Sequence, residues 1–406
     1  MRSWKRLLSA SVFSALLAGS ALSSNTWYVD VHGTPPGTGA QVDPYTSISY
    51  AVDQATTLAG DTVLVLPGNY GPLTFFKALN VRSTDGPAVT RILGDATFGT
   101  GTSVIESLLA GFTIEGRVTM VSGAIDQCAI FAPGGYGIFF DYGGVITRCT
   151  VVGGGIQEFP FDTDHVLIEN TVVLSSGSTD IAATQASRGD GAIRYCRFAS
   201  SSGGWGWANV GNISADPALW DPIHGYLRLK PGSPCIDAGD PAAPLDADGS
   251  RIDMGTFTYD ATYAPRPTSY CTAKMNSLGC LPDIGHQGDC SATNPNAFLV
   301  RATNIVPNKT GFLFYGTGEA SAPFQGGTRC VSTPFKRTPA SNSGSSGGPP
   351  CSGVLSFDFN ARIRSGIDPA LIPGRMVYAQ YYYRDPNDPA GFGTGLSDGL
   401  RFGIAP

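Results

Sequence analysis

Charged side chains are scarce in this sequence. They make up 14% of its 406 residues, whereas about 25% is usual in soluble proteins. Methionine occurs only 5 times, and no long pattern of Ala, Glu, Lys and Leu is present, which argues against a helical bundle or a coiled coil. The sequence also lacks P-loop, Rossmann and metalloprotease signatures, and it has no CxxC or HxxxH spacing for zinc. No motif therefore names a reaction.

Glycine, in contrast, is abundant, with 53 residues. Together with many β-branched residues and few helix formers, this composition predicts a mostly β protein. The hydrophobic content of 42% and the aromatic content of 10% are enough to bury a core and exclude wholesale disorder. At about 100–200 residues per domain, the length indicates two or three domains.

The first 23 residues have the order of a secretory signal peptide. Three cations, Arg2, Lys5 and Arg6, precede an uncharged stretch over 7–22 and small residues at the expected cleavage point after Ser23. The apolar part is shorter than the roughly 20 residues that span a bilayer, and an uncleaved anchor is the alternative. We therefore expect a mature chain that is secreted, at the cell surface or extracellular, with no membrane span.

Removal of the signal peptide leaves 23 basic and 32 acidic side chains, a net charge of −9. No basic cluster occurs along the chain, which disfavours nucleic acid and anionic membrane surfaces as partners. Export permits disulfides among the nine cysteines.

A six-residue pattern recurs five times in the N-terminal half: an aliphatic residue, two variable residues, Phe, Cys or Asn, one outward residue and another apolar one. It covers residues 109–114, 125–130, 146–151, 167–172 and 193–198, with the fourth positions at Phe112, Cys128, Cys149, Asn170 and Cys196. A period near 21 residues with glycine-rich punctuation is typical of a parallel β-helix, whose coils stack about 4.8 Å apart. The fourth positions are then expected inside a bend, where cysteines are buried fillers rather than reactive thiols. A Cys128–Cys149 bridge between neighbouring coils is the alternative.

Residues 44–57 place Ile48, Ala51, Val52 and Ala55 on one helical face. An apolar strand ending in a Pro-Gly turn follows at 60–70. A short amphipathic helix there would cover the open end of the solenoid and hide its first strand edge.

The helix, the Gly60-Asp-Thr-Val to Pro67-Gly-Asn-Tyr70 segment and the repeated rungs resemble the pectin-lyase-like superfamily of right-handed parallel β-helix proteins. The stretches 232–240 and 246–255 resemble the closing region of secreted bacterial β-helix proteins with a choice-of-anchor Q element. The resemblance covers about residues 27–260 and is specific for fold but not for activity. The resemblance implies a right-handed parallel β-helix with an N-terminal helix cap over 24–262. With the signal peptide over 1–23 and a C-terminal domain, the chain is predicted to be all-β.

The C-terminal domain, 268–406, follows a linker and reads as a β-sandwich, because alternating apolar runs are separated by Gly, Pro, Ser and Asn turns. One of its five cysteines has no partner within the domain. We expect a Cys330–Cys351 bridge closing the Ser/Gly/Pro-rich loop between them, and a second pair among Cys271, Cys280 and Cys290. Four tyrosines, Tyr378 and 381–383, suggest either sugar stacking or core packing, and packing is favoured; alternation puts Tyr381 and Tyr383 on one face and Tyr382 on the other.

Two clusters carry candidate chemistry. Acidic, basic and imidazole side chains one coil apart suit a hydrolase or lyase site, and the candidates are Asp162, Asp164, His165, Arg188 and Asp190. Carboxylates around a glycine turn resemble a calcium loop without the full EF-hand spacing, and these are Asp237, Asp240, Asp246, Asp248 and Asp253. We expect no required cofactor; a structural calcium ion held by these carboxylates is one alternative, and ordinary turn formation by the Asp-Gly pair is the other.

The rungs themselves predict no catalytic column. The outward residues that follow the fourth positions are small or hydroxylated (Thr113, Ala129, Thr150, Thr171 and Arg197), and at the bend Arg148 and Glu169 can form a surface ion pair of little energetic value. The leading hypothesis is a non-catalytic protein that binds extracellular polysaccharide or a cell-surface glycan through the flat β-helix face. The alternatives are a polysaccharide lyase or glycoside hydrolase acting on uronate-containing glycans, and a purely structural spacer.

Overall fold

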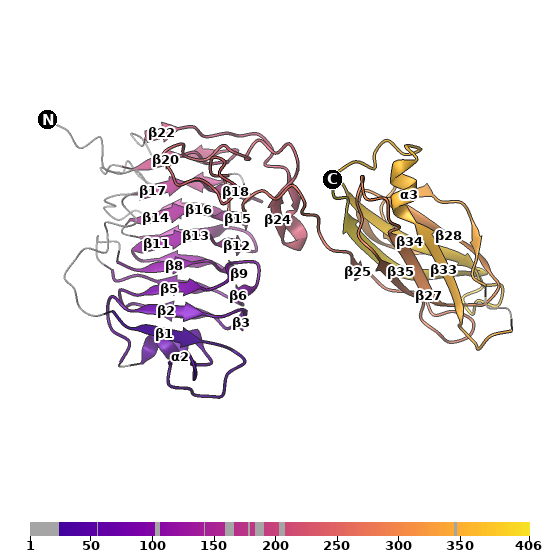
Figure 1. Cartoon of the computed structure of the whole chain (residues 1–406), viewed down its shortest axis with the longest axis horizontal. Coiled ribbons are helices and arrows are strands. Elements are labelled where there is room, and N and C mark those ends of the chain that lie inside the picture. The colour runs from indigo at the N-terminus through magenta and orange to yellow at the C-terminus, as the bar shows by residue number, and fades with distance from the viewer. Residues whose placement is uncertain are drawn as a thin grey trace. The chain divides into compact units, whose positions relative to one another are not determined.

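The computed structural model describes residues 24–54, 56–101, 106–141, 143–158, 166–177, 179–182, 191–202, 208–344 and 347–406 (Figure 1). Contacts divide the chain into two compact units. The first contains the described residues up to Pro222 together with Leu227–Tyr259, and the second contains Ile223–Tyr226 and Asp260–Pro406. Within the described ranges, no helix has the length and apolar character needed to cross a bilayer.

The first unit begins with the predicted cap. Strand β1 (Thr26–Val29) pairs in parallel with β2 (Thr62–Val65), and helix α2 (Ile48–Asp53) packs against both. Ser47 caps α2 by accepting the Tyr50 N–H, and Ile48, Ala51 and Val52 are buried as the sequence predicted. The helix is shorter than the expected 44–57, and Ala55 lies outside the described residues.

Three parallel sheets form the wall of a β-solenoid, which confirms the predicted parallel β-helix (Figure 1). The first sheet runs from β1 and β2 through β5 (Asn80–Ser83), β8 (Leu108–Ala110), β11 (Gly123–Asp126), β14 (Gly144–Thr147), β17 (Val166–Glu169), β20 (Ala192–Arg194) and β22 (Ala208–Val210). The second contains β3 (Gly68–Tyr70), β6 (Thr90–Ile92), β9 (Thr113–Ile114), β12 (Ala129–Phe131), β15 (Thr150–Gly153) and β18 (Val172–Ser175). The third contains β4 (Leu73–Phe75), β7 (Ala96–Phe98), β10 (Val118–Met120), β13 (Tyr136–Phe140), β16 (Gly155–Glu158), β19 (Ile181–Ala182) and β21 (Ser201–Ser202).

The register corrects the sequence alignment in one rung. Ile125, Ile146 and Ile193 line the interior as expected, but their partner in β17 is Ile168, not Leu167. Thr171 therefore takes the inward fourth position, and Asn170 lies one residue earlier, at the bend. Both alignments satisfy the apolar pattern of the rung, and a one-residue shift exchanges inward for outward side chains.

The bend before each fourth position uses left-handed backbone. Gln127, Arg148, Asn170 and Tyr195 have φ between 49° and 52°. Asn tolerates this region best, because its short polar side chain can hydrogen-bond locally. The cysteines that follow three of these bends, Cys128, Cys149 and Cys196, are fully buried and unbridged, which confirms their prediction as fillers.

Residues 235–259, which we call the closing segment, cover the outer surface of the second sheet. Thr256 Oγ1 donates to the Cys128 carbonyl over 2.7 Å, and Thr256 N–H donates to Thr150 Oγ1 over 3.0 Å. Met254 packs with Ala129 and Val172 in the same apolar cluster. The sequence predicted that the outward column faces solvent, but the closing segment buries it. Its members are Thr113, Ala129, Thr150, Val172 and Arg197, with Val172 replacing the predicted Thr171.

A short hairpin precedes the closing segment. It pairs β23 (Leu219–Asp221) with β24 (Tyr226–Leu229) through the 3-10 turn η1 (Pro222–His224). Leu219, Leu227 and Leu229 are buried against the same cluster as Met254, so the hairpin extends the cover over the second sheet.

The second unit has antiparallel sheets that enclose one core. One sheet contains β25 (Thr268–Tyr270), β35 (Thr394–Gly403), β34 (Met376–Arg384), β28 (Thr310–Gly316), β31 (Lys336–Arg337) and β32 (Ser341–Asn342). The other contains β26 (Asp283–Gln287), β27 (Leu299–Ile305) and β33 (Gly353–Asp358), and β29 (Glu319–Phe324) forms a hairpin with β30 (Gly327–Val331). Helix α3 (Phe359–Arg364) is capped by Asp358, which accepts the Ala361 N–H.

The tyrosines of β34 follow the predicted alternation. Tyr381 and Tyr383 belong to the core with Phe298 and Phe402, and Tyr378 is also buried. Tyr382 points to the opposite face and stacks on Phe312. Core packing therefore accounts for Tyr381 and Tyr383. Tyr378 shares the face of Tyr382 and is buried there against Tyr270.

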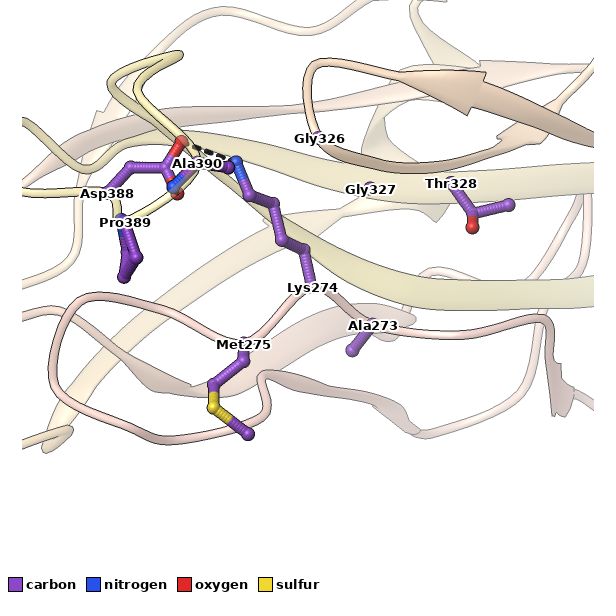
Figure 2. Close-up of a pocket in the computed structure, with 9 residues that line it drawn as sticks. All are labelled: Ala273, Lys274, Met275, Gly326, Gly327, Thr328, Asp388, Pro389 and Ala390. Carbon is purple, nitrogen blue, oxygen red and sulfur yellow. Dashed lines mark hydrogen bonds and ion pairs between the residues drawn. The ribbon is translucent and has the colours of Figure 1, made fainter.

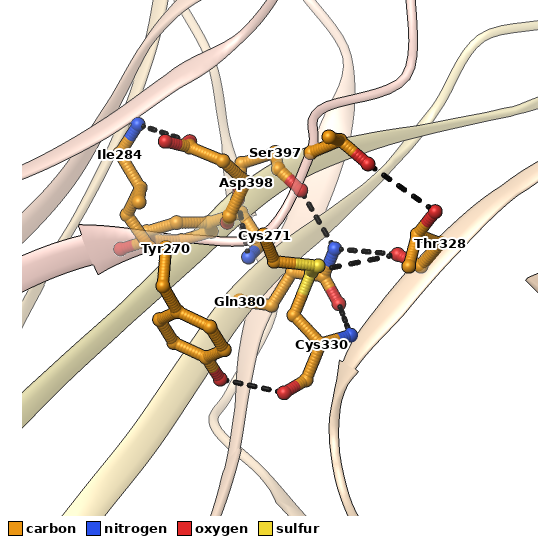
Figure 3. Close-up of a disulfide and its surroundings, with 10 residues drawn as sticks. Tyr270, Cys271, Ile284, Thr328, Cys330, Gln380, Ser397 and Asp398 are labelled. Atoms are coloured by element: carbon orange, nitrogen blue, oxygen red, sulfur yellow. Dashed lines mark hydrogen bonds between the residues drawn. A yellow bond between two sulfur atoms is a disulfide. The ribbon is translucent and has the colours of Figure 1, made fainter. Parts of the chain in front are cut away.

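The disulfide prediction was wrong. The bridges join Cys271 to Cys330 and Cys280 to Cys351, while Cys290 is buried and unbridged. Figure 3 shows why Cys330 lies where it does: Gln380 Oε1 accepts the Cys330 N–H over 2.9 Å, and the Tyr270 hydroxyl donates to the Cys330 carbonyl over 2.6 Å. These contacts bring Cys330 beside Cys271, and sequence proximity to Cys351 does not decide the pairing.

Candidate functional site

All five candidate catalytic residues lie outside the described parts of the chain. Asp162, Asp164 and His165 fall in the gap between β16 and β17, and Arg188 and Asp190 fall in the gap between β19 and β20. Their convergence into a site therefore stays a prediction.

The five candidate calcium ligands lie in the closing segment, where carboxylate oxygens accept hydrogen bonds from the chain. Asp253 accepts the N–H groups of Asp237 and Tyr259 over 2.7 and 2.6 Å. Asp246 accepts the Asp253 N–H over 3.0 Å. Burial raises the pKa of both Asp246 and Asp253. These carboxylates therefore fold the segment on itself.

Asp248 caps the turn before Arg251 by accepting the Ser250 N–H over 2.9 Å. Across the described ranges, no three His, Cys, Asp or Glu side chains are grouped so that they could hold a metal ion. Calcium binding by the closing segment stays a prediction.

A pair of carboxyl groups joins the closing segment to the solenoid, and sequence reasoning missed it. Glu169, at the end of β17, hydrogen-bonds the Asp240 side chain, and Arg194 in the next coil lies 3.0 Å from Glu169 Oε1. Burial raises the pKa of Glu169 to about 7; Arg194 opposes the rise and Asp240 adds to it. The two acids are about 70 residues apart in sequence, so no motif of short spacing predicts that they are in contact.

The predicted Arg148–Glu169 ion pair does not form. Arg148 instead pairs with Asp126 on the preceding coil, where Asp126 Oδ1 also accepts the Thr147 hydroxyl over 2.8 Å. Arg194 replaces Arg148 as the partner of Glu169. The shifted register of β17 is the reason, because it aligns Glu169 with Thr147 and Arg194.

The unbridged thiols are unsuited to nucleophilic chemistry. Burial raises the pKa of Cys128 and of Cys196 to about 12 and that of Cys235 to about 11. Burial likewise raises the pKa of Cys149 and Cys290. Because the thiolate is the reactive form, these cysteines act as apolar fillers near neutral pH.

A cavity of about 320 Å³ in the second unit contains Lys274 and Asp388 (Figure 2). Lys274 Nζ donates to Asp388 Oδ2 over 2.5 Å and to the carbonyls of Gln325 and Thr394 over 2.8 Å each. All three ammonium hydrogens are therefore engaged. Burial is the largest influence and raises the pKa of Asp388, but the hydrogen bond and charge of Lys274 together with the N–H groups of Ala390 and Phe392 outweigh it and lower the pKa. The pair fastens the loop around Ala390 and leaves no free amine for covalent catalysis.

Threonine side chains are stacked on the outer surface of the third sheet. Thr74, Thr97 and Thr119 are in register on β4, β7 and β10, each between two buried inward residues. Phe139 on β13 is the next residue in register, and Gln157 on β16 follows it. Parallel strands repeat about every 4.8 Å, so Thr74, Thr97 and Thr119 present three hydroxyls at regular spacing before Phe139 interrupts the polar column.

Fold and surface together define a parallel β-solenoid protein with an antiparallel C-terminal module. No protein-family model matches the chain, and no curated protein matches it.

Proposed function

We propose that this chain is a secreted, pectin-lyase-like β-helix protein with a choice-of-anchor Q closing region, which binds an extracellular polysaccharide without cleaving it. The observation that carries the proposal is the outward column of Thr74, Thr97 and Thr119 on the third sheet. Each hydroxyl can donate one hydrogen bond and accept two. A regular array of such groups matches the repeated hydroxyls of a glycan.

We assign glycan binding to the third sheet because other parts of the chain occupy the surfaces of the first two sheets. The closing segment buries the outer surface of the second sheet, and the ion pairs Asp126–Arg148 and Glu169–Arg194 occupy the bend beyond the first. Two disulfides support an oxidising, extracellular location.

Retention on immobilised polysaccharides tests the proposal. The mature chain should be retarded on a neutral polysaccharide, and the double variant Thr97→Ala/Thr119→Ala should lose at least five-fold in affinity. Thr62→Ala is the matched control, because Thr62 is an outward threonine on the first sheet. Absence of retention on a broad glycan panel, or equal loss in the control, contradicts the proposal.

The same incubations test the uronate lyase or glycoside hydrolase that Asp162, Asp164, His165, Arg188 and Asp190 would serve. Unsaturated products absorbing in the ultraviolet would indicate a lyase, and new reducing ends alone a hydrolase. Either result would replace the non-catalytic proposal. A spacer would show neither retention nor product.

A further inference from the structure

The two parts of the chain carry opposite charge. Residues 24–259 contain 11 basic and 23 acidic side chains, whereas residues 260–406 contain 12 basic and 9 acidic ones. A polyanion approaching this protein is therefore repelled by the solenoid and attracted by the C-terminal module.

Arg337 is a cation of that module that lies against aromatic rings. It is exposed at the end of β31, and its guanidinium lies over the rings of Phe312 and Phe335, at 5.1 and 5.9 Å from their centroids. Among the described residues, no side chain or carbonyl forms a hydrogen bond or ion pair with the Arg337 guanidinium.

The rings that support Arg337 are themselves fixed. Phe312 stacks on Tyr382, its direct partner across β28 and β34, with centroids 5.0 Å apart and planes 21° apart. Phe335 packs on Phe314 with centroids also 5.0 Å apart. Since Phe314 is the cross-strand partner of Arg337, all these side chains lie on the face of the sheet opposite Tyr381 and Tyr383, where Phe314 itself is buried. We call Phe312, Phe335, Arg337 and Tyr382 the aromatic–arginine cluster.

This arrangement leaves the edge of the guanidinium as the binding surface. Aromatic stacking engages the planar face of an arginine, while its N–H donors point outward in the plane. Two parallel N–H donors match the two oxygens of a carboxylate. Exposed Arg384 lies two residues beyond Tyr382 on the same face of β34 and adds a second positive charge.

We propose that the aromatic–arginine cluster binds the carboxylate groups of a uronate-containing polysaccharide. The inference rests on the proposed function for the glycan nature of the ligand, and it assigns the acidic groups to the C-terminal module. The negative solenoid then contacts uncharged hydroxyls through its threonine column.

Titration of the full mature chain with trigalacturonate at low ionic strength tests this site. The wild type should bind with an affinity that falls as salt is added. Arg337→Gln should lose at least ten-fold, Arg337→Lys should recover part of it, and Phe312→Leu should lose several-fold because the guanidinium is no longer held. Arg301→Gln is the matched control, since Arg301 is an exposed arginine of β27 and its removal changes the net charge equally.

The outcomes separate the two proposals. Loss of trigalacturonate binding in Arg337→Gln, with neutral-polysaccharide retention unchanged, supports the cluster as a distinct site. No binding by the wild type, or equal losses in Arg337→Gln and Arg301→Gln, overturns it even if the solenoid retains neutral glycan. Failure of the threonine column variants to lose neutral retention overturns the proposed function and leaves the trigalacturonate result to be judged by itself.

Discussion

Asn170 holds the closing segment against the solenoid: its Oδ1 accepts the Asp240 N–H over 2.7 Å, across 70 residues of sequence. The same residue has a φ of 50°, and its carbonyl accepts the Gly255 N–H over 2.8 Å. Asn170 thus forms the bend of its coil and also binds the closing segment that lies over that coil. The Glu169–Asp240 contact next to it makes this joint sensitive to protonation as well.

Asn170→Ala should lower the free energy of unfolding of the first unit by about 3 kcal/mol. The variant leaves the buried Asp240 N–H without an acceptor. It also places alanine, which tolerates left-handed backbone less well than Asn, at position 170. Gln127→Ala is the control, because Gln127 has the same backbone conformation and no side-chain hydrogen bond to the closing segment. Urea denaturation measures both, and equal effects would show that Asn170 does not hold the segment.

Glu169 predicts a pH dependence. Its pKa is raised from 4.5 to about 7 in the folded chain, so the folded state keeps a proton that the unfolded state releases. The free energy of unfolding therefore falls as pH rises from about 4.5 to 7, by at most about 3 kcal/mol. Glu169→Gln should flatten this fall, because an amide stays neutral and still hydrogen-bonds Asp240. The exposed Glu115→Gln should keep the wild-type slope, and a fall of the wild-type size in Glu169→Gln would contradict the assignment.

Lys274→Met should destabilise the second unit by about 3–5 kcal/mol, because it leaves the buried Asp388 carboxylate without its counter-ion. Lys336→Met is a milder comparison: its partner Asp368 is buried, but the Lys336 side chain is 52% exposed, so water can take its place, and Asp368 keeps the Tyr315 hydroxyl as a donor over 3.0 Å. Thermal unfolding would compare the two. A small effect of Lys274→Met would mean that the cavity around Asp388 admits solvent.

Non-reducing peptide mapping should recover Cys271 linked to Cys330 and Cys280 linked to Cys351, with Cys290 alkylated only after unfolding. The bridges close loops of 59 and 71 residues. Replacing either pair by serine should cost about 4 kcal/mol in the chain-entropy description. A Cys330–Cys351 peptide would contradict the structure.

Calcium binding by the closing segment predicts a rise in Tm when millimolar calcium replaces a chelator. Asp246→Asn/Asp248→Asn should abolish that rise, while Asp289→Asn, in the second unit, should keep it. A wild-type Tm that is the same with calcium and with chelator would remove the calcium hypothesis and leave these carboxylates with their hydrogen bonds alone.

The repeat in the sequence was sufficient for the solenoid. Aliphatic residues at a fixed place in each rung predicted the interior column of Ile125, Ile146 and Ile193, and the helical face of Ile48, Ala51 and Val52 predicted the cap. Alternation also placed Tyr382 opposite Tyr381 and Tyr383. These features follow from local periodicity, which reports which side of an element faces the core.

Tertiary structure decided which residues pair with one another. Leu167 and Ile168 both satisfy the rung pattern, and only stacking against Ile146 selects Ile168. The same choice sends Arg148 to Asp126 and Arg194 to Glu169. Cys330 pairs with Cys271 because Gln380 and Tyr270 hold it there, and the second sheet loses its open surface to a segment over 100 residues away. Sequence periodicity specifies the face of each strand, whereas pairing depends on which faces meet in space, and that is settled by packing between distant parts of the chain.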